Sequence, residues 1–424
     1  MKPILKRYAA EAIAHQDPAL FNEISLIISE VKSLPKLHES SLQESRLPKL
    51  IMDRLGLNVK FVLVNGGYGE AASSSPIIDP NHVLIKEYQR SKWDSKAPKK
   101  IAQRVSEFKK RLGTVDRKNS KVSGLFSDIE FEIYMSGSFF FGGFTPNETS
   151  AVILHELGHN FTFLEMLSVG LSTNQALTLA CREFFELASE EDRILLLTEL
   201  EHSVGFTIEE KEETAKITDP TTLTTVLVKD YVEGTRSEFG TPLFDMRTAE
   251  YLADQFSTRH GAASALVSAL AKIYEGHRSS RSTPFFLFVE LMKVMLYVPG
   301  GLLATLASGD PIDTFVALFL TNPYSDAYDP PELRMEKIKR DLNLALKQKD
   351  LPPELEKRIL VDLKVIEQLI KDYHDRESLW QKIFLLISPG TRKQRRTYKM
   401  QIELEKLAAN NLYARAAEFR QLQS

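Results

Sequence analysis

The most informative part of the sequence is the pentapeptide His155-Glu156-Leu157-Gly158-His159. Two histidines four residues apart lie on the same face of a helix, so their imidazoles can converge on one metal ion. The intervening glutamate then lies beside the open position of that ion. This arrangement is typical of a zinc hydrolase in which Glu156 is a base and not a ligand.

The residues around this pentapeptide predict a buried helix. Thr145 can cap it, Pro146 suits its first turn, and Glu148 completes a capping box. Gly158 is a poor helix former, which indicates that another element packs closely against its turn. The residues that follow the cap form an almost continuous apolar surface, as expected of a helix in the middle of a domain: Ala151, Val152, Ile153, Leu154, Leu157, Phe161 and Leu164.

A catalytic zinc usually takes three protein ligands, so a third ligand is expected downstream. The best candidate segment runs from Arg247 to Phe256. Glu250 and Asp254 are four residues apart there, so a helix places both carboxylates on one face. One carboxylate can bind the metal while the other accepts a hydrogen bond from a ligand histidine, and we assign these roles to Glu250 and Asp254 respectively.

The pentapeptide together with Arg247, Glu250, Ala253 and Asp254 resembles the gluzincin metallopeptidases of the type that includes the CAAX prenyl proteases and the HtpX-like heat-shock proteases. The resemblance extends in outline over residues 58 to 340, and its specific part is limited to the two metal-binding elements. It implies a zinc endopeptidase in which His155, His159 and Glu250 bind the ion and Glu156 is the base.

The family has a further element, a His-Pro segment followed by an arginine that helps to hold the substrate carbonyl and the active site. In this chain Arg334 matches the arginine, but no histidine is present. Alignment by spacing places Tyr328 at the histidine position, whereas alignment by the first proline places Asp329 there. A tyrosine hydroxyl can donate to a developing oxyanion, so Tyr328 would keep the role and Asp329 would not.

We predict an α+β fold that is predominantly helical: a zincin-like metallopeptidase domain with a small mixed sheet, and further helical regions at both ends. Residues 1–56 form an N-terminal helical cap, residues 57–340 the metallopeptidase domain, and residues 341–424 a C-terminal helical region. Within the central domain, residues 90–121 are strongly basic, with twelve Lys or Arg against three acids. We interpret this segment as a solvated surface, with binding of nucleic acid or of an acidic partner as the alternative. Residues 164–245 are a helical insertion that walls the cleft.

Three strands are expected, near residues 59–65, 82–87 and 128–134. In zinc peptidases of this kind, an edge strand above the metal pairs with the extended substrate. Either the strand at 128–134 or the run Ser138 to Phe141 is a candidate for that edge.

The sequence gives little indication of a membrane span or of secretion. The most apolar segment, Pro284 to Ala307, contains Glu290 and Lys293 and is broken by Pro299-Gly300-Gly301, so we predict a buried core helix and not a membrane span. No signal peptide is evident, and one cysteine, Cys181, suits a reducing intracellular compartment. A formal net charge of -3 implies no general affinity for nucleic acid.

The expected function is hydrolysis of peptide bonds in a restricted set of protein substrates. Glu156 takes a proton from the zinc-activated water and returns it to the leaving amine, and Tyr328 or Arg334 assists the oxyanion. Since the family histidine is missing, the alternative is a peptidase-derived structural or interaction protein within a larger assembly such as a virus particle. A membrane-associated protease of the CAAX type is disfavoured by the broken apolar segment.

Overall fold

The computed structural model describes residues 17–74, 76, 81–92, 100–204, 207–239, 246–281, 331–347 and 351–375. The chain divides into two compact units. The first combines Met1–Thr283 with Ala327–Leu369 and holds every site residue discussed below. The second combines Pro284–Asp326 with Ile370–Ser424, and only its residues 370–375 are described.

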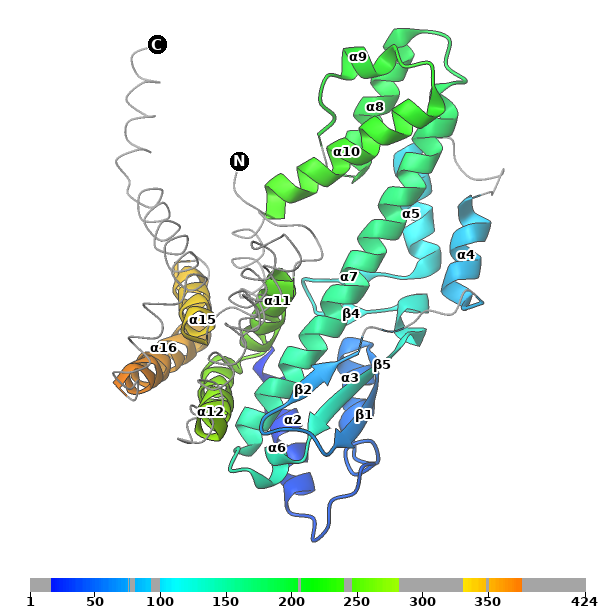
Figure 1. Cartoon of the computed structure of the whole chain (residues 1–424). Coiled ribbons are helices and arrows are strands. Elements are labelled where there is room, and N and C mark those ends of the chain that lie inside the picture. Colours follow the sequence, from blue (N-terminus) through cyan, green and yellow to red (C-terminus); the bar gives the residue numbers. More distant parts are fainter. Residues whose placement is uncertain are drawn as a thin grey trace, which may run out of the picture. The chain divides into compact units, whose positions relative to one another are not determined.

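The described part of the first unit is mostly helical with a small mixed sheet, as predicted. Its longest element is the 39-residue helix α7 (Pro146–Phe184), which runs from the sheet to a separate group of helices (Figure 1). The predicted capping box starts this helix. The Thr145 amide donates to Glu148 Oε2 at 2.6 Å, and the Glu148 amide donates to Thr145 Oγ1 at 3.2 Å.

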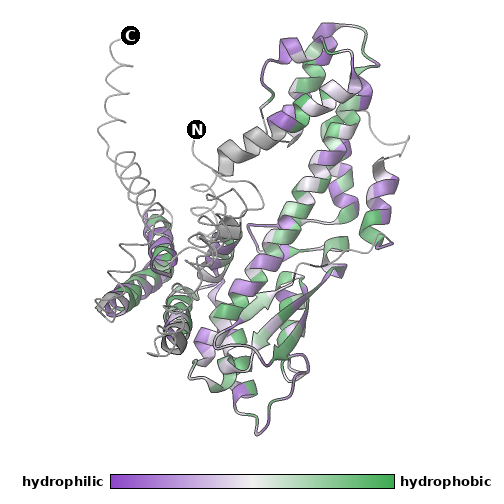
Figure 2. Ribbon diagram, viewed as in Figure 1, coloured by the Kyte–Doolittle hydropathy of each residue, from purple (hydrophilic) through white to green (hydrophobic). Residues whose placement is uncertain are grey.

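The main sheet has three strands in the order β1-β5-β2. Strand β1 (Asn58–Val64) pairs in parallel with β5 (Glu130–Ser136), and β2 (Ala71–Ser73) pairs antiparallel with the other side of β5. Buried apolar side chains on β1 and β5 give both strands a hydrophobic face (Figure 2). A second, two-stranded sheet joins β3 (Val115–Asp116) to β4 (Lys121–Val122), and the 3-10 helix η1 (Gly124–Asp128) follows.

Three strand-related predictions are wrong. Residues 82–87 lie at the start of helix α4 (Val83–Lys92), where a run of three apolar residues is too short to distinguish strand from helix. The strand predicted at 128–134 is β5, which lies in the centre of the sheet and therefore has no free edge. The run Ser138 to Phe141 is the short helix α6 (Ser138–Phe141), which buries the adjacent residues Phe139 and Phe140.

The N-terminal region is helical where it is described, with α2 (Pro18–Lys32) and α3 (Leu47–Leu55). Helix α2 packs against α7. Its buried residues recur at helical spacing: Leu20, Phe21, Ile24, Ile27, Ile28 and Val31.

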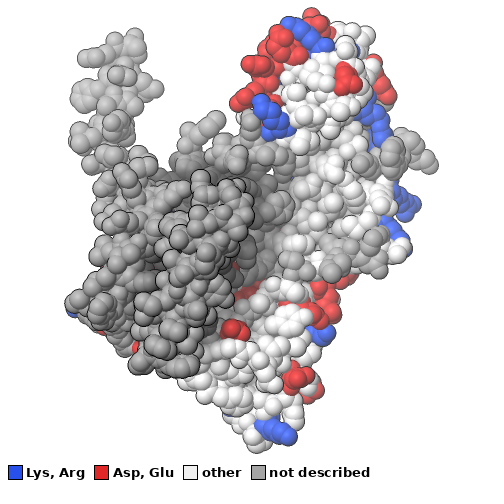
Figure 3. Space-filling model, viewed as in Figure 1, with Lys and Arg blue, Asp and Glu red and all other residues white. Residues whose placement is uncertain are grey.

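The far half of α7 forms a second hydrophobic core with α5 (Ile101–Leu112), α8 (Glu190–Val204) and α10 (Pro220–Phe239), and the short helix α9 (Lys211–Ala215) packs against α8. Ala176, Ala180 and Phe184 are the α7 side chains in this core. The basic residues Lys109, Lys110 and Arg111 of α5 are exposed, whereas Arg104 of the same helix is buried. Acidic side chains gather over the end formed by α8 and α9 in the view of Figure 3.

Helix α11 (Met246–Arg259) crosses α7 at Gly158, and this close approach confirms the prediction made from that glycine. A Cβ atom at Gly158 would lie 2.8 Å from Ala253 Cα and 2.9 Å from Phe256 Cβ. Ser257 Oγ adds a hydrogen bond of 3.0 Å to the carbonyl of Ala151. Helices α12 (Ala263–Arg281), α15 (Pro331–Ala345) and α16 (Pro353–Asp375) complete the described fold.

We expect opposite effects from two glycine substitutions in α7. Gly158→Ala should destabilise the protein by about 1 to 3 kcal/mol, because its methyl group overlaps α11. Gly170→Ala should stabilise it by roughly 0.5 to 1 kcal/mol, since a Cβ there meets nothing within 4 Å and alanine is the better helix former. Urea unfolding of both variants measures the difference. Equal effects would mean that α7 and α11 do not touch at Gly158.

Among the described helices, none is long and apolar enough to cross a bilayer. The segment Pro284 to Ala307, for which we predicted a core helix, lies outside the described residues.

Candidate metal centre

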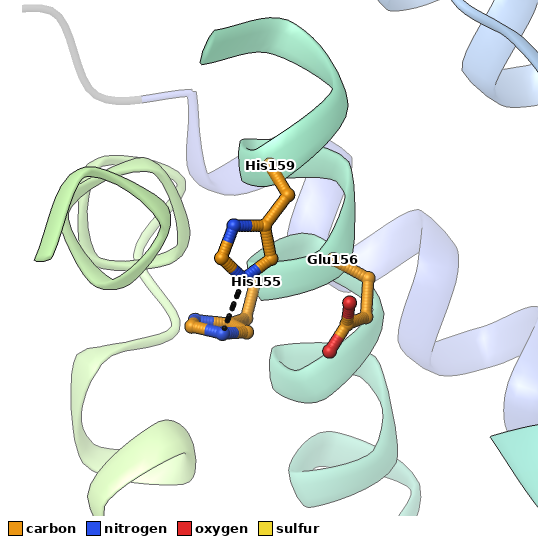
Figure 4. A group of neighbouring side chains, drawn as sticks. All are labelled: His155, Glu156 and His159. Atoms are coloured by element: carbon orange, nitrogen blue, oxygen red, sulfur yellow. Dashed lines mark hydrogen bonds between the residues drawn. The ribbon is translucent and has the colours of Figure 1, made fainter. Parts of the chain in front are cut away.

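The structure brings together the three side chains that the sequence assigns to metal binding. His155 and His159 project from consecutive turns of α7, and their Nε2 atoms lie 3.2 Å apart (Figure 4). Glu250 of α11 reaches both rings. Its Oε2 lies 3.4 Å from His155 Nε2 and its Oε1 lies 3.3 Å from His159 Nε2. Two nitrogens and one carboxylate therefore converge on one point between α7 and α11.

These separations fit a tetrahedral metal ion. Zinc binds imidazole nitrogen and carboxylate oxygen at about 2.0 to 2.2 Å, which sets neighbouring ligand atoms of a tetrahedron roughly 3.3 to 3.6 Å apart. The two nitrogens lie 3.2 Å apart, just below that range, and each nitrogen lies within it from a different oxygen of Glu250, at 3.4 Å for His155 and 3.3 Å for His159. A divalent ion can be accommodated with little movement of the side chains.

The charge of the site also fits a divalent cation. Glu156, Glu250 and Asp254 are all buried, and Arg334 is the buried cation beside two of them. With neutral imidazoles, three carboxylates and one guanidinium leave a formal charge of −2. Buried charge without a counterion is costly, so this excess favours a bound cation.

The pKa values of His155 and Glu250 reflect the same excess of negative charge. Burial alone would lower the pKa of His155, but the carboxylates of Asp254 and Glu250 outweigh it and raise that pKa to about 10. Burial would raise the pKa of Glu250, yet hydrogen bonds from His155 and His159 hold it well below its usual range. The site therefore favours positive charge at the point where the ligand atoms meet.

Glu156 lies on the adjoining face of α7. Its carboxylate is within 4.8 Å of the ligand nitrogens of both histidines, and the side chain is 5% exposed. Figure 4 shows this carboxylate beside the imidazole pair. Glu156 is thus close enough to act on a molecule held at the metal position without itself being needed as a ligand.

Solvent reaches the site from the His159 side. The His159 side chain is 22% exposed, against 9% for His155 and 10% for Glu250. An incoming group would therefore approach the cluster at His159.

Asp254 and Arg334 contact the side chains that would bind the metal. Asp254 Oδ1 lies 3.0 Å from His155 Nδ1, the nitrogen that does not face the metal position, although the angle falls short of a hydrogen bond. Arg334 donates from Nε and Nη2 to the Asp254 carboxylate, at 2.9 and 2.6 Å, and its Nη1 lies 3.2 Å from Glu250 Oε2. The guanidinium therefore orients both carboxylates.

Asp341 anchors α15, and with it Arg334, to α11. This buried carboxylate accepts hydrogen bonds from Tyr251 Oη at 3.0 Å and Gln255 Nε2 at 3.1 Å. Burial raises its pKa to about 6, against the lowering effect of Arg340 and of these two donors. The folded-state pKa thus exceeds the unfolded value near 3.9, so Asp341 contributes stability that is complete below about pH 4 and is lost as pH rises through 6.

Asp341→Asn should therefore change the pH dependence of unfolding. Between pH 4 and pH 7 the stability of the variant relative to wild type should rise by up to about 3 kcal/mol, because asparagine has no ionisation to suppress. Asp219→Asn is the control with opposite sign, since amides of the α10 N-terminus lower the pKa of Asp219. Parallel stability curves for wild type and Asp341→Asn would contradict this account.

Two predicted site residues cannot be placed. Tyr328 and Asp329, the alternatives for the missing family histidine, both lie outside the described residues. Conversely, the structure shows a contact that the sequence did not suggest. Asn160, next to His159 and 1% exposed, accepts a hydrogen bond from Ser73 Oγ of strand β2.

No protein-family model, curated protein or solved structure shows significant similarity to this chain. Function is therefore inferred from the chain's own residues.

Proposed function

We propose that the protein is a zinc-dependent endopeptidase with a zincin-like catalytic domain of the gluzincin type. The observation that carries the proposal is the convergence of His155 Nε2, His159 Nε2 and the Glu250 carboxylate within 3.2 to 3.4 Å of one another in a buried site. Imidazole and carboxylate donors suit zinc, and three protein ligands with an adjacent carboxylate are typical of catalytic and not structural zinc sites.

A zinc ion in this site would polarise a carbonyl group and acidify a water molecule. Glu156 accepts the proton of the attacking water and delivers it to the leaving amine, as a general base and then a general acid. Asp254 lies beside Nδ1 of His155, which leaves the Nε2 of this ring for the ion. Arg334 keeps both carboxylates ionised and fixed in orientation, so it acts on the ligands and not on the substrate.

The sheet offers a binding edge for an extended peptide. Strand β2 lies beside α7 and, among the described strands, pairs only with β5 (Figure 1). The Ser136 amide bonds to the Glu70 carbonyl and the Ser74 amide to the Glu132 carbonyl, both at 2.9 Å. By the alternation of an antiparallel pair, the main-chain groups of Ala71 and Ser73 point to the other edge. A substrate strand can pair there.

The helix places Glu156 on the side of this edge. Asn160 follows Glu156 by four residues, so both project from one face of α7, and Asn160 is bonded to Ser73 of β2. A peptide paired with β2 would therefore cross the helix next to Glu156 and the imidazoles. We infer that the substrate is an extended polypeptide segment and not a small molecule.

Metal removal tests the proposal. Protein loaded with one equivalent of zinc should cleave members of an unbiased peptide library. Dialysis against a chelator should abolish cleavage and zinc should restore it, with cobalt as a second metal that suits the same donors. Cleavage that survives complete metal removal would exclude a metallopeptidase mechanism.

A further inference from the structure

We infer that Ser73 and Asn160 form a positioning pair that sets the register of the substrate strand against Glu156. This inference rests on the proposed peptidase function and adds to it the residues that select which peptide bond is cut. Neither residue touches the metal position. Both would act through the placement of strand β2.

Ser73 belongs to the proposed substrate-binding edge and also contacts helix α7. Its main-chain groups point to the edge of β2 that no described strand covers, where a substrate strand would pair, while its side-chain hydroxyl donates to Asn160 Oδ1 of α7. A shift of Ser73 along the helix would therefore shift the paired substrate by the same amount. Strand β2 is only three residues long, so its few main-chain bonds to β5 fix its position weakly.

Asn160, the helix partner of Ser73, lies close to the catalytic residues in the same helix. It follows His159 directly in the chain and lies one helical turn beyond Glu156 on the same face. The residue is 1% exposed, and its Nδ2 makes no hydrogen bond within the described part of the chain. A buried amide that is only half satisfied is costly, which argues against a role confined to stability.

The geometry required for catalysis makes this link important. Reacting groups must be held near 3 to 3.5 Å, and a displacement of about 1 Å can lower a rate roughly 100-fold. Ser73–Asn160 is a side-chain hydrogen bond between the proposed substrate edge and the helix that carries Glu156. Its loss should let the substrate strand slide while the metal ligands stay in place.

The test uses full-length zinc-loaded protein and a peptide that wild type cleaves at one bond. The variants are Ser73→Ala, Asn160→Ala and the double variant, with Ser73→Thr as the conservative replacement that keeps the hydroxyl. Ser172→Ala is the matched control, because it removes another buried α7 hydroxyl that bonds only to the backbone of its own helix. Zinc content, kcat, KM, melting temperature and the mass of every product are measured.

We expect Ser73→Ala and Asn160→Ala each to lower kcat about 10- to 100-fold. Products displaced by one or two residues should appear, zinc content should stay at one per chain, and the double variant should be no worse than either single variant. Ser73→Thr and Ser172→Ala should resemble wild type.

Unchanged kcat and an unchanged cleavage site in both alanine variants would overturn the inference while leaving the peptidase proposal intact. So would a loss of rate that only follows lost zinc or unfolding, because the pair would then be merely structural. If zinc-loaded wild type cleaves no peptide at all, the proposed function fails and the inference fails with it.

Discussion

Glu156→Gln should retain the fold and the bound zinc but lower the hydrolysis rate by about 10² to 10⁴, the usual contribution of a general base. Glutamine has the size of glutamate, so the packing of this 5% exposed side chain is preserved. Its amide cannot accept the proton of the attacking water. The loss should therefore appear in kcat, with little change in KM.

Two companion variants make this result specific. Glu156→Asp keeps a carboxylate but withdraws it from the histidines, so its rate should fall between those of wild type and Glu156→Gln. Glu130→Gln removes an exposed carboxylate from β5 and should have wild-type activity. Equal, poor cleavage of a broad peptide library by wild type and Glu156→Gln would favour the alternative, a protein that keeps the metal for an assembly role without turnover.

His159→Ala should reduce bound zinc from one per chain to less than about one tenth, because two ligands remain of a set of three. Zinc should accordingly raise the stability of wild type by about 2.7 kcal/mol at 100 times its Kd, and leave the variant unchanged. Metal analysis and thermal unfolding with and without zinc measure both effects.

His38→Ala serves as the control, because it removes an exposed histidine remote in sequence from the cluster. It should bind zinc like wild type. If His159→Ala keeps its full zinc content, the ion is bound elsewhere and the assignment of His159 as a ligand is wrong.

The parts of the fold that could be predicted are those with strong local signals. The Thr145–Glu148 capping box and the apolar run after it correctly indicated a buried helix, and Gly158 correctly indicated a close crossing. Strands β1 and β5 were recognised because apolar residues recur in both. Each of these signals is contained within one helix or strand and needs no knowledge of the tertiary structure.

The errors occurred where tertiary contacts outweigh a short pattern. Val83-Leu84-Ile85 has the composition of a strand, yet only Leu84 is buried and the segment is helical. Strand β2 has the sequence Ala-Ala-Ser, which has no strong strand propensity, and it forms because β5 pairs with it. The central position of β5 likewise depends on strand order, which the sequence does not reveal.

The candidate site, too, could be predicted where the signal is local and not where it depends on tertiary contacts. The spacing of His155 with His159 and of Glu250 with Asp254 follows from helix geometry, so each pair could be placed on one face in advance. Arg334 was expected to help to hold the substrate carbonyl and the active site because a family pattern contains an arginine there. In the structure its donors are directed to Asp254 and Glu250, a contact between helices 80 residues apart in the chain that no local pattern could indicate.

X-ray absorption at the zinc edge, on protein loaded with one equivalent of zinc, tests the central claim most directly. We predict four nitrogen or oxygen neighbours at about 2.0 to 2.1 Å, including two imidazoles, and the loss of one imidazole in His155→Ala. A six-coordinate ion without imidazole, a sulfur neighbour from Cys181, or protein that takes up no zinc would contradict a catalytic metal centre at His155, His159 and Glu250.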